Sequence, residues 1–342
     1  MRAAVYYSNS DVRIEEIPVP QIGPGETLVH IRASGICGSD VLEWYRVPKA
    51  PIVLGHEVAG DVVAVGDGVT NVAVSDRVVV SHHVPCSTCR HCLSDNHTAC
   101  HTLHTTNFDP GGFAEYVRVP ALQTDRGILV MPDSMSYEQG TFVEPLGCVV
   151  RAQVRAGVRP GSTVLVVGSG ISGLLHIRLA LALGAGRVFA TDVSEYRLNW
   201  ARKSGATRAF DAIAAGDKLP ELLREANDGA LADLVILGTG APSAIDQGLA
   251  CLESGATFVV FAVPAPGENH PMPLNELWRR EVIVRTAYGA APADLAMAMD
   301  LIATGRVHVD DLITHRLPLE QAGEGFKLVA DAGESVKVVL EG

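Results

Sequence analysis

The sequence contains a dense group of cysteines with the spacing C-x2-C-x2-C-x7-C, formed by Cys86, Cys89, Cys92 and Cys100. Four thiolates in one short segment suit a tetrahedral, closed zinc site of the structural kind. An iron–sulfur centre is the main alternative, because soft thiolates also bind that metal. The bacterial ferredoxin run closes with three residues and then a proline, whereas here seven residues separate the last two cysteines and His101 follows. We therefore predict structural zinc.

A second set of metal-binding residue types is dispersed along the chain: Cys37, the pair His56 and Glu57 in GHE, and Glu144 in VEPLG. One Cys, one His and one or two Glu can form a zinc site that keeps an open position, which is the catalytic arrangement. Each residue also has an ordinary structural explanation as a core thiol, a hydrogen-bonded imidazole or a capping carboxylate. The spacing alone does not connect them.

Ser39 and Asp40 follow Cys37 closely in the stretch CGSDVLEWY. A serine suits the N-cap of a helix, and an aspartate suits the positive end of the helix dipole. Helix initiation is therefore the simplest interpretation of these two residues when they are considered alone.

Residues 168–173 read GSGISG, directly after the apolar run VLVV and directly before a helical pattern. In this context Gly168 would permit the tight turn, Gly170 would allow a pyrophosphate to approach the backbone, and Gly173 would allow close packing of helix on strand. Ile171 and Ser172 then begin the helix, whose free N–H groups favour phosphate. The pattern predicts a dinucleotide site.

Asp192 ends the next apolar run, RVFATD, about where this fingerprint places an acid for the ribose 2′-hydroxyl. A carboxylate there would repel a 2′-phosphate, so the sequence favours NAD over NADP. Arg197 lies five residues further on and could accept such a phosphate. The preference for NAD therefore needs a direct test.

The elements that would position these groups change in type along the chain. The first 150 residues contain short apolar runs separated by turn signals such as GPGE and DPGG, which predict many short strands. From about residue 160, apolar strands alternate with helical segments, which predicts a doubly wound parallel sheet. The final segment predicts one more helix and a few strands. The expected fold class is α/β.

The composition excludes several classes of function. The chain has 342 residues, 47% hydrophobic residues and a formal net charge of −12, which suits two packed domains and argues against nucleic-acid or anionic-membrane partners. The seven cysteines are an odd number, and no export signal precedes them, so we expect no disulfide framework. No uncharged stretch reaches membrane-spanning length, and we expect a cytoplasmic protein.

Taken together in this order, GICGSD, GHEVAG, the cysteine group, GGFAEY, EPLG and GSGISG resemble the zinc-containing medium-chain alcohol dehydrogenases, in their sorbitol and threonine dehydrogenase-like branch. The resemblance covers nearly the whole chain. It implies a β-rich, GroES-like catalytic domain over residues 1–150, to which residues 290–342 return. A Rossmann domain that binds NAD would occupy residues 151–289.

The resemblance also implies roles for individual residues. Cys37 and His56 would bind catalytic zinc, with Glu57 and Glu144 as the carboxylates, and which of the two contacts the metal stays open. Zinc lowers the pKa of a bound alcohol, and the nicotinamide accepts hydride. Ser39 would hydrogen-bond the alcohol, and Asp40 would orient His56 from behind. The family further suggests a homodimer or homotetramer.

Two positions depart from the family pattern. Leu42 stands where many relatives have a histidine that carries the proton outward. Arg151 stands where relatives often have a histidine, and a domain-junction ion pair is the interpretation we favour. The loss at Leu42 weakens the threonine dehydrogenase interpretation, because that enzyme uses the histidine.

The leading hypothesis is a dehydrogenase that transfers hydride from a secondary alcohol or polyol, its small-molecule partner, to NAD and releases the ketone. The alternative within the family is an L-threonine 3-dehydrogenase-type enzyme acting on amino alcohols. A protein that binds zinc and nucleotide without catalysis is the alternative from another class. Such a protein would not need both zinc-ligand sets.

Overall fold

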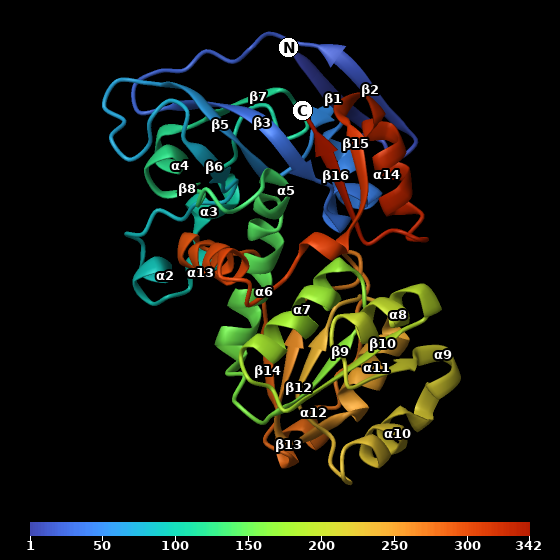
Figure 1. Cartoon of the computed structure of the whole chain (residues 1–342). Helices are drawn as coiled ribbons and strands as arrows, with labels where there is room; N and C mark the ends of the chain where they lie inside the picture. The colour runs from blue at the N-terminus through green and yellow to red at the C-terminus, as the bar shows by residue number, and fades with distance from the viewer. The chain divides into compact units, whose positions relative to one another are not determined.

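The computed structural model describes residues 1–342, which divide into two compact units (Figure 1). Unit 1 comprises Met1–Gly147 and Gly289–Gly342, and unit 2 comprises Cys148–Tyr288. The first boundary falls inside helix α6 (Val143–Ala156). Unit 1 is therefore built from both ends of the chain, and unit 2 is one continuous insertion.

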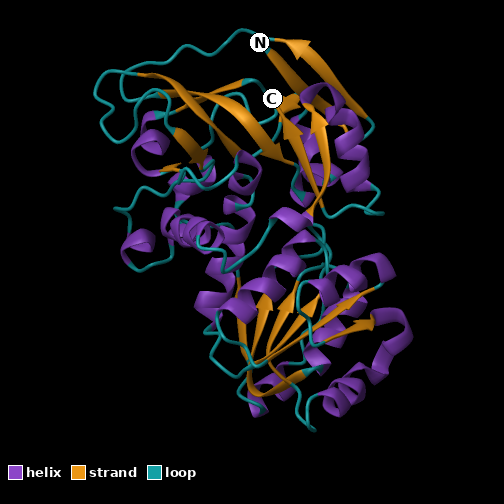
Figure 2. Ribbon diagram, in the orientation of Figure 1, coloured by secondary structure: helices purple, strands orange, loops and turns teal.

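Unit 1 is rich in β-structure (Figure 2). Its strands are β1 (Arg2–Ser8), β2 (Asp11–Glu16), β3 (Thr27–Gly35), β4 (Ile52–Val53), β5 (Glu57–Val65), β6 (Arg77–Val80), β7 (Tyr116–Val119), β8 (Ile128–Val130), β15 (Ile313–Pro318) and β16 (Lys337–Glu341). The larger sheet has the order β15-β16-β3-β5-β6-β8, with β7 also paired to β3, and a smaller sheet has the order β2-β1-β4. The C-terminal strand β16 pairs antiparallel with β3, which joins the two ends of the chain.

Alternation of residue types explains why these strands form. In β3 the side chains of Thr27, Val29 and Ile31 are buried, while the residues between them are partly exposed. Antiparallel sheets with one face on the core show this period of two. Val29 and Ile31 join valines of β5, β6 and β7 in one apolar core.

The helical segments of unit 1 are short, apart from α13 and α14. They are η1 (Gly38–Val41), α1 (Glu43–Arg46), η2 (Val47–Lys49), α2 (Arg90–Leu93), η3 (His97–Ala99), α3 (His101–Thr105), α4 (Ala121–Arg126), α5 (Tyr137–Gly140), α13 (Pro292–Ala303), η5 (Asp310–Leu312), η6 (Leu319–Gln321) and α14 (Ala322–Ala330). The first of these, η1, begins directly after Cys37. In the cysteine group, Cys92 lies in α2, Cys89 and Cys100 are the N-caps of α2 and α3, and Cys86 precedes α2.

Unit 2 is a sheet of parallel strands with helices on both faces (Figure 2). Its strands are β9 (Thr163–Val167), β10 (Arg187–Asp192), β11 (Arg208–Asp211), β12 (Ala232–Leu237), β13 (Leu252–Val260) and β14 (Ile283–Thr286), in the order β11-β10-β9-β12-β13-β14. Its helices after α6 are α7 (Ile171–Ala182), α8 (Glu195–Lys203), α9 (Ala212–Ala215), η4 (Gly216–Lys218), α10 (Leu219–Ala226), α11 (Pro242–Ala250) and α12 (Leu274–Arg279).

This strand order confirms the predicted doubly wound fold. The chain proceeds from β9 outward to β11 and then restarts on the other side of β9 with β12. Right-handed crossovers then place the helices of the two halves on opposite faces of the sheet. The order reverses at β9, and in such sheets ligands bind at this reversal, beyond the carboxyl ends of the strands.

The prediction of one helix in the final segment is wrong, because α14 follows α13 there. Gly323 and Gly325 lower the helical propensity of this stretch, which hid it. The glycine at 325 is needed for packing, since a Cβ atom there would lie 2.7 Å from Cδ1 of Ile36.

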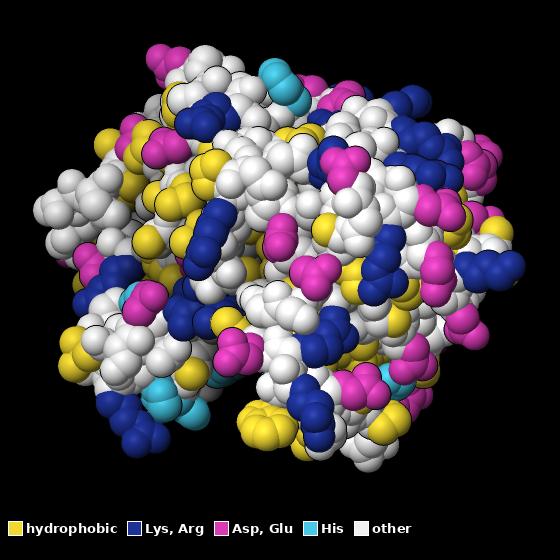
Figure 3. Space-filling view, turned by 90° about the horizontal axis from the view of Figure 1, so that it is seen from below, with side chains coloured by type: hydrophobic (Ala, Val, Ile, Leu, Met, Phe, Trp, Pro, Cys, Tyr) yellow, Lys and Arg dark blue, Asp and Glu magenta, His cyan; other side chains and the backbone are white.

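No helix is long and apolar enough to cross a membrane. In Figure 3, acidic and basic side chains are interspersed over the face shown, which presents no extended basic surface. An extended basic surface is what binding to the phosphates of a nucleic acid requires. The interspersed charges on this face offer no such surface.

Candidate metal centres and dinucleotide site

The four cysteines of the α2–α3 segment converge on one point. The Sγ atom of Cys92 lies 3.5 Å from that of Cys89 and 3.9 Å from that of Cys86, and the Sγ atoms of Cys100 and Cys86 are 3.6 Å apart. A tetrahedron with Zn–S bonds of about 2.3 Å has sulfur–sulfur edges of about 3.8 Å. The donor set therefore fits a closed zinc site, and all four cysteines are free thiols.

Hydrogen bonds prepare this cluster for the thiolate form. The amide of Cys89 donates to Sγ of Cys86 at 3.3 Å, and the amide of Cys86 donates to Sγ of Cys100 at 3.4 Å. Contacts with Thr88 and the Cys89 amide lower the pKa of Cys86 to about 5. Burial and the neighbouring sulfurs raise the pKa of Cys92 to about 12, which a bound metal would reverse.

The dispersed set also comes together in part. The ligand atoms of Cys37, His56 and Glu57 all lie within 4.8 Å of one another. Cys37 precedes η1 and forms its N-cap, accepting from the Ser39 amide at 3.4 Å, so the cap is Cys37 and not Ser39. His56 and Glu57 meet Cys37 because β5, which begins at Glu57, pairs with the end of β3.

Asp40 is fully buried and holds His56 in a defined orientation. Its Oδ1 atom lies 3.3 Å from Nδ1 of His56, and its Oδ2 atom accepts from the Cys37 amide at 3.1 Å. With Nδ1 occupied in this way, Nε2 of His56 remains for a metal. Burial lowers the pKa of His56, but the charges of Asp40 and Cys37 outweigh it and raise that pKa well above its usual value.

Arg46, which no sequence motif singles out, donates hydrogen bonds to both Ser39 and Asp40. Its Nη2 atom donates to Oγ of Ser39 and to Oδ1 of Asp40, each at 3.2 Å, and its Nε atom donates to the Ser39 carbonyl at 3.0 Å. Burial would raise the pKa of Asp40, but His56 and Arg46 outweigh it and lower that pKa. Arg46 is the last residue of α1 and lies close to Ser39 and Asp40 in the sequence. The turn between η1 and α1 is therefore enough to bring its side chain back to these two residues.

Glu57 has a second partner that lies far away in the sequence. Its carboxylate forms a buried ion pair with the ammonium of Lys337, the first residue of β16. Both side chains are almost completely inaccessible to solvent. The charge of Glu57 is therefore already compensated, which makes this carboxylate the poorer of the two candidate zinc ligands.

Two further histidines line up beside His56. The ring centroid of His82 lies 4.9 Å from that of His56 and 3.8 Å from that of His83. Burial is the main cause that lowers the pKa of His82 well below its usual value and that of His83 to about 4. Both rings are therefore neutral near pH 7. The run SHHVPC contained these residues, but it carries no recognised metal spacing.

Glu144 is the second residue of α6 and belongs to unit 1, and it is not in the group of ligand atoms within 4.8 Å. Leu42 follows η1 with 39% of its surface exposed. Arg151 is buried on the part of α6 that belongs to unit 2. The expected role of Glu144 as a ligand therefore still depends on the resemblance.

The glycine-rich turn of unit 2 has the geometry that a pyrophosphate needs. Gly168 has a φ of +93°, which favours glycine, and a Cβ atom on Gly173 would lie 2.0 Å from the Gly168 carbonyl oxygen. A Cβ atom on Gly170 would meet nothing within 4 Å. Ile171 and Ser172 are the first residues of α7, and the free N–H groups of a helix start favour a phosphate.

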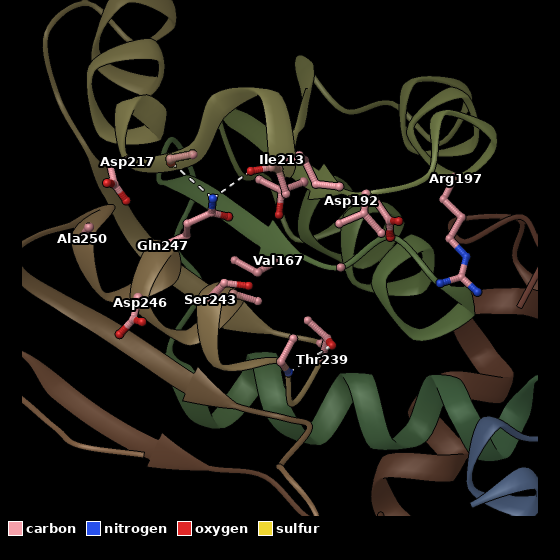
Figure 4. A pocket seen from close by; sticks show the side chains of 18 of the residues that line it. Val167, Asp192, Arg197, Ile213, Asp217, Thr239, Ser243, Asp246, Gln247 and Ala250 are labelled. Carbon is pink, nitrogen blue, oxygen red and sulfur yellow. Dashed lines mark hydrogen bonds between the residues drawn. The ribbon is translucent and has the colours of Figure 1, made fainter. Parts of the chain in front are cut away.

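A cavity of about 770 Å³ opens at this turn within unit 2 (Figure 4). Its lining residues include Gly168 and Gly170 of the glycine-rich turn, together with Ile213, Gln247 and Ala250. Its size suits a nucleotide, since ligand cavities range over about 300–1,000 Å³. The cavity lies at the order reversal of the sheet, as this fold requires.

Charged groups in the cavity are mainly acidic. Asp192 lies at the end of β10 and accepts from the Ser169 amide at 2.7 Å and from the Ser194 amide at 2.9 Å. Asp217 and Asp246 also line the cavity, together with Arg197 (Figure 4). The structure thus brings Asp192 and Arg197 to the same cavity as the glycine turn.

Comparisons with known proteins agree with this architecture. The model of the alcohol dehydrogenase GroES-like domain matches residues 23–132, and that of the zinc-binding dehydrogenase matches residues 172–304. A probable D-xylulose reductase A from Aspergillus clavatus is 34% identical over 97% of this chain and 94% of its own. A sorbitol dehydrogenase from Gallus gallus is 33% identical over 99% of this chain and 96% of its own.

Solved structures give the same result. A zinc-binding dehydrogenase from Sinorhizobium meliloti, bound to NADP, superimposes with a TM-score of 0.88, 28% identity, and coverage of 100% of this chain and 99% of its own. The β-rich first part is therefore GroES-like, as the resemblance implied. The chain belongs to the zinc-containing medium-chain alcohol dehydrogenase family, in its sorbitol dehydrogenase-like branch.

Proposed function

We propose that the protein is a zinc-dependent dehydrogenase that oxidises a polyol or another secondary alcohol with NAD and releases the ketone. The observation that carries this proposal is the joint presence of the cluster of Cys37, His56 and Glu57 in unit 1 and the nucleotide-sized cavity in unit 2. A protein that only bound zinc and nucleotide would not need the first cluster. The names of its relatives support a polyol as substrate.

In unit 1, Cys37 and His56 would hold the catalytic zinc, with Glu144 as the expected third ligand. When bound, zinc acts as a Lewis acid that makes an alcohol easier to deprotonate. Asp40 fixes the ring of His56 through Nδ1. Cys86, Cys89, Cys92 and Cys100 would hold the structural zinc.

Ser39 is the proposed hydrogen-bonding partner of the substrate hydroxyl. Its Oγ atom accepts a hydrogen bond from Arg46, so one lone pair is occupied and the hydroxyl hydrogen is directed elsewhere. A guanidinium does not give up its proton in proteins, so Arg46 orients Ser39 but cannot carry the proton onward. Arg46 therefore does not replace the histidine that is missing at Leu42.

We propose NAD as the cofactor because Asp192 ends β10 beside the glycine turn, where a carboxylate favours a ribose 2′-hydroxyl over a 2′-phosphate. Asp192, Asp217 and Asp246 line the cavity together with Arg197. A 2′-phosphate beside Asp192 would meet the charge of its carboxylate, whereas a ribose 2′-hydroxyl can donate a hydrogen bond to it. Assembly as a homodimer or homotetramer is a proposal that rests on the resemblance, and location in the cytoplasm is a proposal that rests on the sequence pattern.

A screen of NAD reduction tests the function. Zinc-replete protein is assayed with sorbitol and xylitol, with simple secondary alcohols and with threonine, and each active substrate is repeated with NADP. We expect activity with polyols, preference for NAD, and two zinc ions per chain. Full activity after removal of both metals would overturn the mechanism, and a preference for threonine would overturn the proposed substrate class.

A further inference from the structure

The guanidinium of Arg46, beside the candidate zinc centre, is only partly used by the protein. It donates from Nε and Nη2 to Ser39 and Asp40, and its Nη1 atom has no hydrogen-bond partner. Solvent reaches this Nη1 atom, whereas the unpartnered Nε atom of Arg118 is buried. Guanidinium N–H groups form their strongest hydrogen bonds with carboxylate and phosphate oxygens. Arg46 therefore has donors left for an anion from outside the protein.

Lys49 brings a second positive charge to the same place and forms no ion pair. Its Nζ atom lies 3.7 Å from the ring centroid of Tyr45, and the guanidinium carbon of Arg46 lies 4.5 Å from the same centroid. Tyr45 and Lys49 are both exposed. Glu43 has the helical spacing to pair with Arg46, but its Oε1 atom accepts from the Asn9 amide at 3.1 Å instead. The ammonium of Lys49 is therefore uncompensated.

The buried carboxylates nearby already have their own partners. Asp40 pairs with His56 and with Arg46, and Glu57 pairs with Lys337. None of these contacts offsets the charge of Lys49. The two cations that share the ring of Tyr45 repel each other, and an anion bound beside them would convert this repulsion into attraction. The ligand that suits this surface is therefore negatively charged.

We propose that Arg46 and Lys49 bind an anionic group, a carboxylate or a phosphate, that the alcohol substrate carries. The Nη2 atom of Arg46 donates to Oγ of Ser39, the proposed partner of the reacting hydroxyl. An anion at Nη1 of the same guanidinium would thus lie a few carbon atoms along the substrate from that hydroxyl. This inference rests on the proposed function and specifies its substrate class: sugar acids or polyol phosphates instead of neutral polyols.

Three compounds with one carbon skeleton test the inference: sorbitol, gluconate and sorbitol 6-phosphate. Each is assayed as a substrate with NAD, and also as a competitor of the best alcohol from the activity screen, so that a compound that is not oxidised still reports binding. We expect at least one anionic compound to have a KM or inhibition constant about tenfold or more below that of sorbitol. The two anionic compounds distinguish a carboxylate site from a phosphate site.

Lys49→Gln removes the uncompensated charge and leaves the hydrogen bonds of Arg46 in place. We expect it to reduce the preference for the anionic compound over sorbitol by about fivefold. Lys49→Arg keeps the charge and should retain most of the preference. Lys327→Gln removes an exposed charge from α14 of the same unit and is the control for net charge, with the preference of the wild type.

Salt provides a readout that a merely structural role of Lys49 would not change. The preference of the wild type for the anionic compound should weaken as KCl is raised, because salt screens the attraction between exposed charges. In Lys49→Gln the remaining preference should depend less on salt.

The outcomes separate the two proposals. Protein that oxidises no alcohol of the screen, charged or neutral, overturns the proposed function and this inference with it. Protein that oxidises polyols but binds neither anionic compound more tightly than sorbitol overturns the inference alone. A preference for an anionic compound that is unchanged in Lys49→Gln also overturns it, because other residues would then bind the anion.

Discussion

The carboxylate of Glu57 and the ammonium of Lys337 form a buried ion pair although 280 positions separate them in the sequence. Gly35 makes the pair possible, because a Cβ atom there would lie 2.4 Å from Oε2 of Glu57 and 2.7 Å from Nζ of Lys337. The pair thus joins the C-terminal strand to the residue that follows His56. Stability of unit 1 and the order of the candidate zinc centre depend on the same contact.

Replacing Lys337 with methionine should destabilise the protein strongly. The substitution leaves the carboxylate of Glu57 buried without a counter-charge, which costs about 3–5 kcal/mol in comparable buried pairs. Urea unfolding of the full chain measures the loss. The double variant E57Q/K337M removes both charges, and we expect it to recover a large part of the stability. Equal losses in the single and double variants would contradict this account.

Two glycines of the GSGISG turn allow an effect on cofactor binding to be distinguished from an effect on folding. Gly173→Ala places a methyl group against the Gly168 carbonyl oxygen, 2.0 Å away. It should therefore lower the free energy of unfolding by about 1–3 kcal/mol. Gly170→Ala meets open space in the protein, and its methyl group would occupy the place of the pyrophosphate. It should therefore weaken NAD binding by about tenfold or more without lowering the melting temperature, as titration and thermal unfolding can show.

Local patterns predicted the fold well, and long-range pairing limited the prediction of the site. Strand–helix alternation from residue 160 onward was sufficient for the doubly wound sheet, because each βα unit is a local pattern. Lys337 could not be linked to Glu57 from the sequence, since no periodicity states that β16 pairs with β3. Hydrogen bonding of Arg46 to Ser39 and Asp40 was missed for a different reason: it depends on the exact turn between η1 and α1.

The cysteine cluster predicts a stoichiometry. Cys92→Ala removes one of four ligands from the closed site, so zinc content should fall from about two ions per chain to about one. Unit 1 should also lose stability, because binding of structural zinc contributes to folding. Cys251→Ala is the control, since it removes one buried thiol of unit 2 that belongs to neither ligand group. Elemental analysis that finds equal zinc in the two variants would argue against the site.

Asp192 should determine the choice of cofactor. Asp192→Asn keeps the size of the side chain and an oxygen for the Ser169 amide, but it removes the charge. We expect the ratio of kcat/KM with NAD to kcat/KM with NADP to fall by about tenfold or more, which equals about 1.4 kcal/mol. Asp217→Asn changes another carboxylate of the same cavity and should have a smaller effect. A larger effect at Asp217 would assign the role to that residue.

His176 gives unit 2 a dependence of stability on pH. Its ring is buried in α7, its Nδ1 atom lies 3.1 Å from Nε2 of Gln153, and burial lowers its pKa from 6.5 to about 3. The unfolded chain therefore binds a proton below pH 6.5 that the folded chain does not bind until about pH 3, so stability falls as the pH falls through this window.

At pH 5 this one residue should cost about 2 kcal/mol relative to pH 7.5. His176→Gln keeps a polar group for Gln153 but cannot titrate, so the variant should lose about 2 kcal/mol less than the wild type over that range. Urea unfolding at the two pH values measures the difference. Other histidines with lowered pKa values, such as the half-buried His82 and His83, contribute equally to both proteins and cancel in the comparison. Identical pH dependence in the two proteins would show that the ring of His176 is accessible to protons in the folded state.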